Sequence, residues 1–297
     1  MYLLVLYLLL FVSLGCFGVG CFSKKKLRYK ARIAGYIIFG LYWLFYTPHY
    51  FYIHDYLPMF LSGTTILGFG FLAYNEYISF RMEEKNESME FLAKLIFGAG
   101  VAYYVIDCIP GISAILIQIV TEQSVWFANA LFMNGVTTGG LNYLGNSQFI
   151  RSNFEEIYME VVWNGKNVVN IVLACTGIQA IVVDVFAVLA TSSSLKRKCM
   201  CIGITIPVIY FVNAIRNAIV IYCTATNYSW FSGVTGFEFA HNFVGKVISF
   251  STLFILTLLM FKILPDFYEK IIGIVELFKR VKNYRNRNSG SHKTITF

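Results

Sequence analysis

The sequence predicts an all-α polytopic membrane protein with about seven transmembrane helices, an N-terminus outside the cell and a C-terminus in the cytoplasm. Of its 297 residues, 57% are hydrophobic and 13% are charged, and the mean hydropathy is +0.63. Soluble domains carry about 25% charged residues, so this composition excludes an ordinary soluble domain. Because the chain shows no repeat or linker, we expect residues 1–297 to form a single transmembrane domain. Runs near the roughly 20 apolar residues that cross a bilayer lie at 1–22, 33–53, 58–79, 90–109, 167–192, 200–223 and 238–262.

The distribution of basic residues predicts the orientation. The net charge is +8, and the basic residues gather after the first, third, fifth and seventh runs, on one side of the membrane throughout. The positive-inside rule makes that side cytoplasmic. The first run has no basic residue before it, which indicates a retained span and not a cleaved signal peptide. A solvated basic cytoplasmic tail of about 263–297 explains the remaining positive charge better than a nucleic-acid partner, so we expect no nucleic acid.

The region between the fourth and fifth runs, about 111–166, is predicted to lie at the outer face. Its first part, 111–133, is nearly long enough to cross a bilayer, but a span here would move Lys196, Arg197 and Lys198 outside. Polar residues also interrupt it. We therefore interpret it as an interfacial or re-entrant helix, followed by a glycine-containing loop and an amphipathic segment.

Cysteine and histidine spacing predicts no metal site and no cofactor. Six cysteines have no paired spacing, so we interpret them as small buried hydrophobic residues. His49, His54 and Asp55 form the one candidate ligand group, but tyrosines and phenylalanines surround them, which favours an interfacial aromatic belt. The six cysteines are Cys16, Cys21, Cys108, Cys199, Cys201 and Cys223.

Three polar residues inside the last spans are candidates for catalysis. A polar residue in lipid is costly, about 2.5–3.5 kcal/mol for Arg or Lys, and is therefore a functional candidate. Cys175 in "LACTGIQ" lies about 12 Å below the outer end of its span, at roughly 1.5 Å per residue. Arg216 in "FVNAIRNAIVIY" has a similar depth, and His241 in "GFEFAHNFVGK" is shallower. The three residues thus converge under the outer face.

The three side chains suit acyl transfer. A thiol with an ordinary pKa of about 8.5 is mostly protonated at neutral pH, unless a base or a cation lies beside it. His241 is placed to take the proton, and Arg216 to stabilise the thiolate and the oxyanion that forms when the thiolate attacks a carbonyl. The expected product is a thioester acyl-enzyme on Cys175.

Neighbouring residues supply candidate supporting groups near the thiol. Gln179 lies four residues after Cys175 and is expected on the same helix face, whereas Gly177 permits close approach of a backbone. Asp184 lies on the opposite face, where we expect a structural pairing deeper in the bundle.

Two further supporting residues lie near the other candidates. Asn213 lies three residues before Arg216, and we expect it to orient the guanidinium. Glu238 lies three residues before His241, and we expect it to hold the second ring nitrogen, as the third member of a triad does.

Other interpretations fit the same residues. A single buried cysteine is more often a packing residue, and a histidine near an interface can simply reach for water. Arg216 and Lys246 would then bind an anionic substrate in a non-catalytic transporter or assembly factor, and Cys175→Ala would be nearly silent. A third interpretation is a membrane protease that hydrolyses its substrate.

The motif "ACTGIQ", the motif "NAIRN" in the next span and a histidine that opens the last span resemble the exosortase and archaeosortase family of membrane-embedded cysteine transpeptidases. The resemblance is specific over about 167–262, and "ACTGIQ" is most similar to the archaeosortase A branch. In that family the cysteine is the nucleophile, the arginine of an NxxR motif assists it, and the third residue is histidine in many members. The resemblance assigns these roles to Cys175, Arg216 and His241.

The resemblance also implies partners and a location. Family members act on secreted proteins that end in a tripartite signal: a short motif such as Pro-Gly-Phe, a hydrophobic helix and a basic tail. They cleave near the motif on the extracytoplasmic side of the cell membrane. The new C-terminus passes to an acceptor, which is a lipid in the archaeal case.

Overall fold

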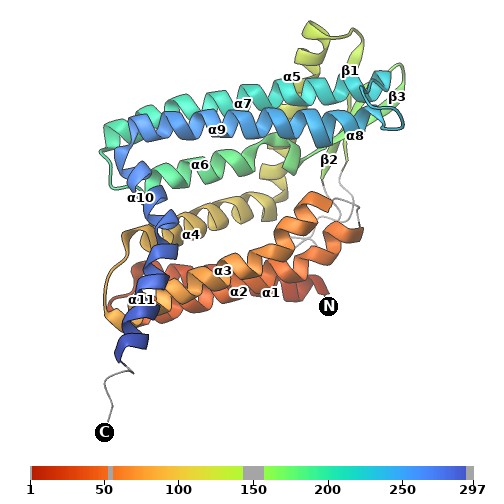
Figure 1. The fold of residues 1–297 in the computed structure, drawn as a ribbon. Coiled ribbons are helices and arrows are strands. Elements are labelled where there is room, and N and C mark those ends of the chain that lie inside the picture. The colour runs from red at the N-terminus through yellow and green to blue at the C-terminus, as the bar shows by residue number, and fades with distance from the viewer. Residues whose placement is uncertain (1, 53–55, 143–156, 292–297) are drawn as a thin grey trace. The chain divides into compact units, whose positions relative to one another are not determined.

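The computed structural model describes residues 2–52, 56–142 and 157–291, most of which are helical (Figure 1). The prediction of an all-α polytopic membrane protein is confirmed, with one small sheet added. Among the described residues, six helices have the length and composition needed to cross a membrane. The contacts divide the chain into two compact units, residues 1–100 with 266–297, and residues 101–265.

The first unit is built around aromatic residues from its long helices. Phe17 of α1 (Tyr2–Phe22) packs edge-on against Tyr36 of α2 (Lys25–Tyr52), with ring centroids 4.9 Å apart. Arg32 of α2 forms a buried ion pair with Glu76 of α3 (Tyr56–Met82), at 3.4 Å. Because many tyrosines lower its hydropathy, α2 is not among the six candidate spans, although 33–52 is helical as predicted.

The C-terminal residues of the first unit differ from the expected solvated tail. They form α10 (Pro265–Val275) and α11 (Leu277–Ser291), which return to the N-terminal helices. Lys270 of α10 is paired with Glu87 at the start of α4 (Glu87–Cys108) and with Asp266. The pair with Glu87 holds part of the basic segment against α4, whereas Asp266 belongs to α10 itself.

The structure also describes one residue of the candidate ligand group and the six cysteines that were expected to be buried. The His49 ring packs on Tyr46, with centroids 5.1 Å apart, whereas His54 and Asp55 lie outside the described residues. The prediction that six cysteines are buried is wrong for Cys199, which is exposed near the charged start of its helix; the other five are buried or partly buried.

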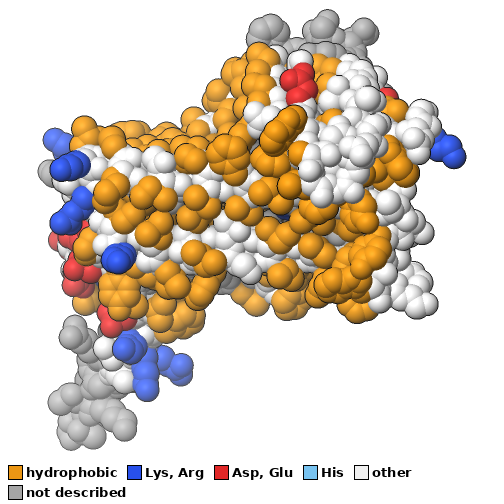
Figure 2. All heavy atoms as spheres, turned by 90° about the horizontal axis from the view of Figure 1, so that it is seen from above, with side chains coloured by type: hydrophobic (Ala, Val, Ile, Leu, Met, Phe, Trp, Pro, Cys, Tyr) orange, Lys and Arg blue, Asp and Glu red, His pale blue; other side chains and the backbone are white. Residues whose placement is uncertain are grey.

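The second unit contains the last long helices and the sheet. α7 (Leu195–Thr226) and α9 (Gly245–Ile263) run side by side, with the shorter α6 (Ile178–Ala190) along α7 (Figure 1). The short elements α8 (Gly236–Glu238) and η2 (Phe239–Val244) precede α9. Hydrophobic side chains cover most of the helical surface seen from above (Figure 2), as expected for helices that face lipid. Those most exposed on α7 and α9 include Leu195, Phe211, Phe250, Phe254 and Ile255.

The prediction that the apolar run 167–192 forms a single transmembrane helix is wrong. It divides into strand β3 (Lys166–Val172), the 3-10 turn η1 (Leu173–Thr176) and helix α6. The first part is rich in β-branched valine and isoleucine, which favour a strand. Asn164 and Gly165 both have positive φ, which suits the tight turn that pairs β3 with its neighbour.

The outer region 111–166 also differs from the expected helix and loop. Its described part contributes β1 (Val136–Asn142) and β2 (Tyr158–Trp163), and β1, β2 and β3 form an antiparallel sheet in that order. One face of the sheet packs on α5 (Pro110–Leu131) and α7 through Val161, Ile171 and Ile221.

The segment predicted as an interfacial or re-entrant helix forms α5 (Pro110–Leu131). It is a continuous helix, and the re-entrant interpretation stays a prediction. Its length and composition would allow it to cross a membrane. Figure 1 shows it running steeply across α7, whereas α9 runs alongside α7. Whether it lies at the interface stays a prediction.

Candidate functional site

Cys175 lies where the sheet ends and α6 begins. Strand β3 leads directly into η1, and Thr176 closes that turn by donating a hydrogen bond from its hydroxyl to the Leu173 carbonyl at 2.7 Å. Gly177 follows with φ +76°, a left-handed conformation that glycine adopts without strain. Cys175 and Gln179 therefore lie in different elements, so the prediction that they share one helix face is wrong.

Two asparagines of α7 hold the backbone at Cys175. The carbonyl of Cys175 accepts hydrogen bonds from Nδ2 of Asn213 at 2.8 Å and from Nδ2 of Asn217 at 3.0 Å. Gly177 leaves room for this arrangement, since a Cβ there would lie 3.1 Å from Cγ of Asn213. The position of the cysteine is thus fixed by amides from successive turns of one helix.

These contacts change one prediction and add a residue. Asn213 was expected to orient Arg216, but its amide donates a hydrogen bond to the Cys175 carbonyl. Asn217 was not predicted. Its sequence signal was the four-residue spacing from Asn213, which places both amides on one face of α7.

Arg216 extends from the same helix into the site. Its side chain lies against Gly245 of α9, where a Cβ would stand 2.8 Å from Nε of the arginine. That Nε is buried and has no hydrogen-bond partner among the described residues. The guanidinium interacts electrostatically with Cys175. A buried cation with an unused donor therefore lies within electrostatic range of Cys175, and its role in activating the thiol stays a prediction.

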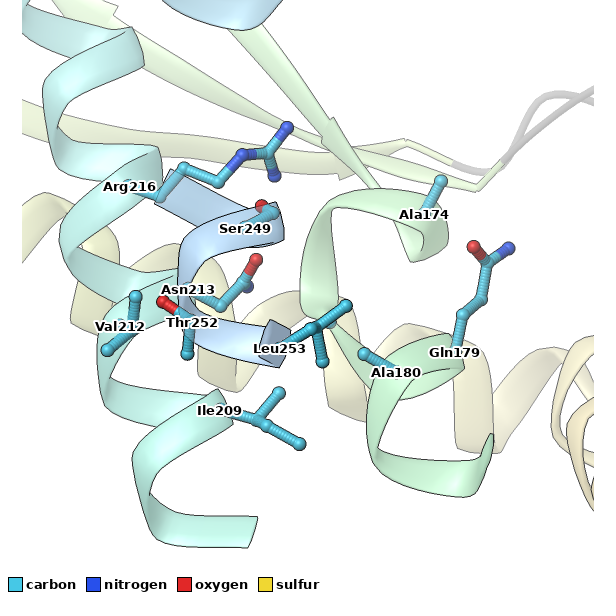
Figure 3. Close-up of a pocket in the computed structure, with 11 residues that line it drawn as sticks. Ala174, Gln179, Ala180, Ile209, Val212, Asn213, Arg216, Ser249, Thr252 and Leu253 are labelled. Carbon is cyan, nitrogen blue, oxygen red and sulfur yellow. The ribbon is translucent and has the colours of Figure 1, made fainter. Parts of the chain in front are cut away.

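A cavity of about 230 Å³ opens between α6, α7 and α9 (Figure 3). In Figure 3, Arg216 and Asn213 extend from α7, Gln179 extends from α6, and Ser249, Thr252 and Leu253 belong to α9. Gln179 also donates a hydrogen bond to the hydroxyl of Tyr103 at 2.9 Å. One part of the cavity wall is polar, and the rest is apolar or small, with Ala174, Ala180, Ile209, Val212 and Leu253.

His241 lies in the wide turn that precedes α9. Element η2 is π-helical, a geometry that recurs at functional sites. The imidazole is stacked on Phe237, with centroids 5.1 Å apart and planes 10° apart. Gly245, against which Arg216 lies, comes four residues after His241. Phe239 and Ala240 bind this turn to α7 through contacts with the buried Val220 and Cys223.

Glu238 has a different role from the one predicted. Its carboxylate accepts hydrogen bonds from the backbone and hydroxyl of Thr235, and the Thr235 hydroxyl in turn accepts one from the Glu238 amide. This capping box starts α8 and leaves Glu238 exposed. Asp184, in contrast, is buried and accepts a hydrogen bond from Thr205 of α7, which is the structural pairing predicted for it.

Replacing Gly245 with alanine should slow catalysis by displacing Arg216. The new Cβ would stand 2.8 Å from Nε of the arginine and 3.0 Å from the carbonyl of Ala240, so the guanidinium must move. We expect processing to fall by roughly ten-fold or more, because small displacements of a charge-stabilising group cost rate. The matched control is Gly203→Ala on α7, which meets nothing within 4 Å and should keep wild-type activity. Equal activities would mean that the position of Arg216 is unimportant.

Comparison with known proteins decides the family. The sequence model of the transmembrane exosortase family matches residues 3–260, nearly the whole chain. This chain belongs to the exosortase family. An exosortase-family relative, Archaeosortase A from Haloferax volcanii, is 21% identical over 220 residues, which cover 72% of this chain and 70% of that protein. No solved structure matches the chain. The family is one of sortase-like transpeptidases, so the predicted resemblance is confirmed and enzyme activity is supported.

Proposed function

We propose that this exosortase-family protein is a sorting transpeptidase that forms a thioester on Cys175. Its substrates would be secreted proteins that end in a short motif, a hydrophobic helix and a basic tail. The observation that carries the proposal is the placement of Arg216, whose Nε is buried and unused and whose side chain lines the cavity. Asn213 lines the same cavity and, with Asn217, holds the Cys175 carbonyl. Such preorganised donors stabilise developing negative charge without reorganisation.

In the acylation step the Cys175 thiol transfers its proton to His241, and the thiolate attacks the carbonyl carbon of the scissile peptide bond. Arg216 stabilises the thiolate and then the oxyanion of the tetrahedral intermediate. The C–N bond breaks, and the leaving amine takes the proton from the His241 imidazolium. The C-terminal segment of the substrate, with its hydrophobic helix and basic tail, departs. The secreted protein is then held as a thioester on Cys175.

In the second step a nucleophile of the acceptor attacks the thioester carbonyl. His241 accepts the proton of that nucleophile, and the Cys175 thiolate leaves. Apolar cavity residues such as Ile209, Val212 and Leu253 favour transfer over hydrolysis, because they limit access of water. A lipid is the acceptor that fits a cavity between membrane helices.

The proposal places the site toward the extracytoplasmic face of the cell membrane. The basic segment 196–198 at the start of α7 would be cytoplasmic, and the opposite end of that helix, with the sheet and Cys175, would face outward. The motif of a secreted protein arrives at this depth when its own hydrophobic helix inserts beside the bundle.

Hydroxylamine distinguishes transfer through a thioester from direct hydrolysis. The purified protein is incubated with a tripartite-signal peptide in the presence of hydroxylamine, and the new C-terminus of the product is identified by mass spectrometry. We expect a hydroxamate, because hydroxylamine intercepts the thioester. A product that is only the free acid at all hydroxylamine concentrations would contradict the proposal and support a simple protease.

A further inference from the structure

We propose that the free edge of β3 binds the extended substrate segment that precedes the scissile bond, as a strand added to the sheet. This inference rests on the proposed function, since it assumes that Cys175 attacks a peptide carbonyl. It concerns a binding surface outside the cavity. The occupant is a polypeptide in extended conformation, recognised mainly through its backbone.

The first support is that β3 has an unused edge. The sheet order is β1-β2-β3, so β3 pairs with β2 on one side only. On its other side, the backbone of β3 makes no hydrogen bond within the described parts of the chain. A free strand edge carries donors and acceptors at regular spacing and is a ready template for another strand.

The register shows which residues present these groups. In a two-residue hairpin the residues that flank the turn, here Trp163 and Lys166, exchange both hydrogen bonds, and the pattern then alternates. An irregularity at Val168 shifts the alternation by one residue. The backbone groups of Asn170 and Val172 therefore face the free edge.

The second support is continuity with Cys175. Val172 is the last residue of β3, and η1 with Cys175 follows at once. Because β3 ends beside the nucleophile, a substrate strand whose C-terminal carbonyl reaches Cys175 must run parallel to β3. Backbone pairing would then align this carbonyl, and the cavity would bind the residues around the cleavage point.

The side chains of β3 argue against a second copy of this chain as the occupant. Lys166, Asn167 and Asn170 are exposed on this short strand. A charge and polar residues at an edge discourage pairing between identical edges. A substrate that is held at one end by its membrane helix does not need a long apolar edge.

The first test is an N-methyl scan of the substrate. Peptides with one backbone N-methyl group at successive positions before the scissile bond are given to the full-length protein in detergent, and the rate of acyl-enzyme formation is measured. We expect a period of two, in which every second N-methyl group lowers the rate by about ten-fold, because it removes one donor and blocks the edge. A series without this period would overturn the inference.

The second test changes the edge itself. Asn170→Pro removes an N–H from the free edge and leaves the pairing with β2 intact, as edge strands tolerate. We expect it to lower the acylation rate by about ten-fold, while Asn170→Ala, which keeps the N–H, stays close to wild type. Alkylation of Cys175 by iodoacetamide should be equal in both variants, which shows that the site is intact.

The outcomes separate this inference from the proposed function. If the wild-type protein forms no acyl-enzyme with any peptide, the proposed function fails. If it forms one with no period of two, or if both Asn170 variants behave alike, the edge inference alone fails. A third outcome is that the Asn170→Pro substitution dissociates a dimer and that the N-methyl series shows no periodic change in rate. This outcome would assign the edge to a second copy of the chain and would also overturn the inference. Should the proline variant not fold, the scan on the wild-type protein decides.

Discussion

Replacing Cys175 with alanine should abolish processing of a tripartite-signal substrate and leave the protein folded. The alanine removes the nucleophile but keeps the backbone carbonyl that Asn213 and Asn217 hold. We expect a loss of roughly 10³-fold or more, as when a nucleophile is removed from other acyl-transfer enzymes. Processing is measured by mass spectrometry of the substrate, and folding by thermal unfolding in detergent.

The matched control is Cys199→Ala. Cys199 is exposed at the start of α7, in an element that also carries Arg216, and its replacement should leave processing unchanged. Normal processing by a folded Cys175→Ala variant would contradict the thioester mechanism. Combined with a severe effect of Arg216→Ala, it would support the alternative of an anion-binding transporter or assembly factor that uses Arg216 and Lys246.

Replacing Arg216 with glutamine should lower the rate of acylation by roughly 10²–10³-fold, the usual effect of losing an oxyanion donor. The side chain lies beside Gly245, and its Nε has no partner among the described residues, so its positive charge is available to the reaction. Arg216→Lys should restore part of the rate, because lysine keeps the charge but loses the planar fork. Single-turnover kinetics should show the loss in the chemical step, with little change in KM.

Arg197→Gln is the matched control for this second prediction. Arg197 is an exposed arginine on the same helix as Arg216, and its loss should leave the rate of acylation unchanged. If the Arg216→Gln substitution raised KM and left the rate of acylation unchanged, the result would contradict a role in transition-state stabilisation. It would indicate that the arginine binds the ground-state substrate.

The sequence predicted the long helices well and the surroundings of Cys175 poorly. Length and hydropathy identify α7 and α9, because a helix that crosses lipid needs a long apolar run. The same measure cannot separate a helix from a short buried strand, so the valines of β3 were assigned to a span. The signal that would have corrected this is the Asn164-Gly165 pair, which favours a hairpin between β-branched segments.

For the candidate site, depth within the spans and spacing along one helix gave predictions of different value. Depth within the spans suggested that Arg216, Cys175 and His241 converge; the structure gives Arg216 and Cys175 an electrostatic interaction, and the convergence of all three residues stays a prediction. Spacing along one helix failed for Asn213 and Glu238, since it identifies neighbours on the same element and not partners from another. Asn213 reaches across to η1, and Glu238 caps its own helix.

The most direct test of the account is the intact mass of the enzyme during a single turnover. The full-length protein is mixed with a tripartite-signal peptide, quenched in acid and analysed by mass spectrometry with peptide mapping. We predict an added mass equal to the acyl segment of the peptide, located on Cys175 and absent from the Cys175→Ala variant. Cleavage of the peptide with no adduct on Cys175 at any time during the turnover would contradict the thioester mechanism.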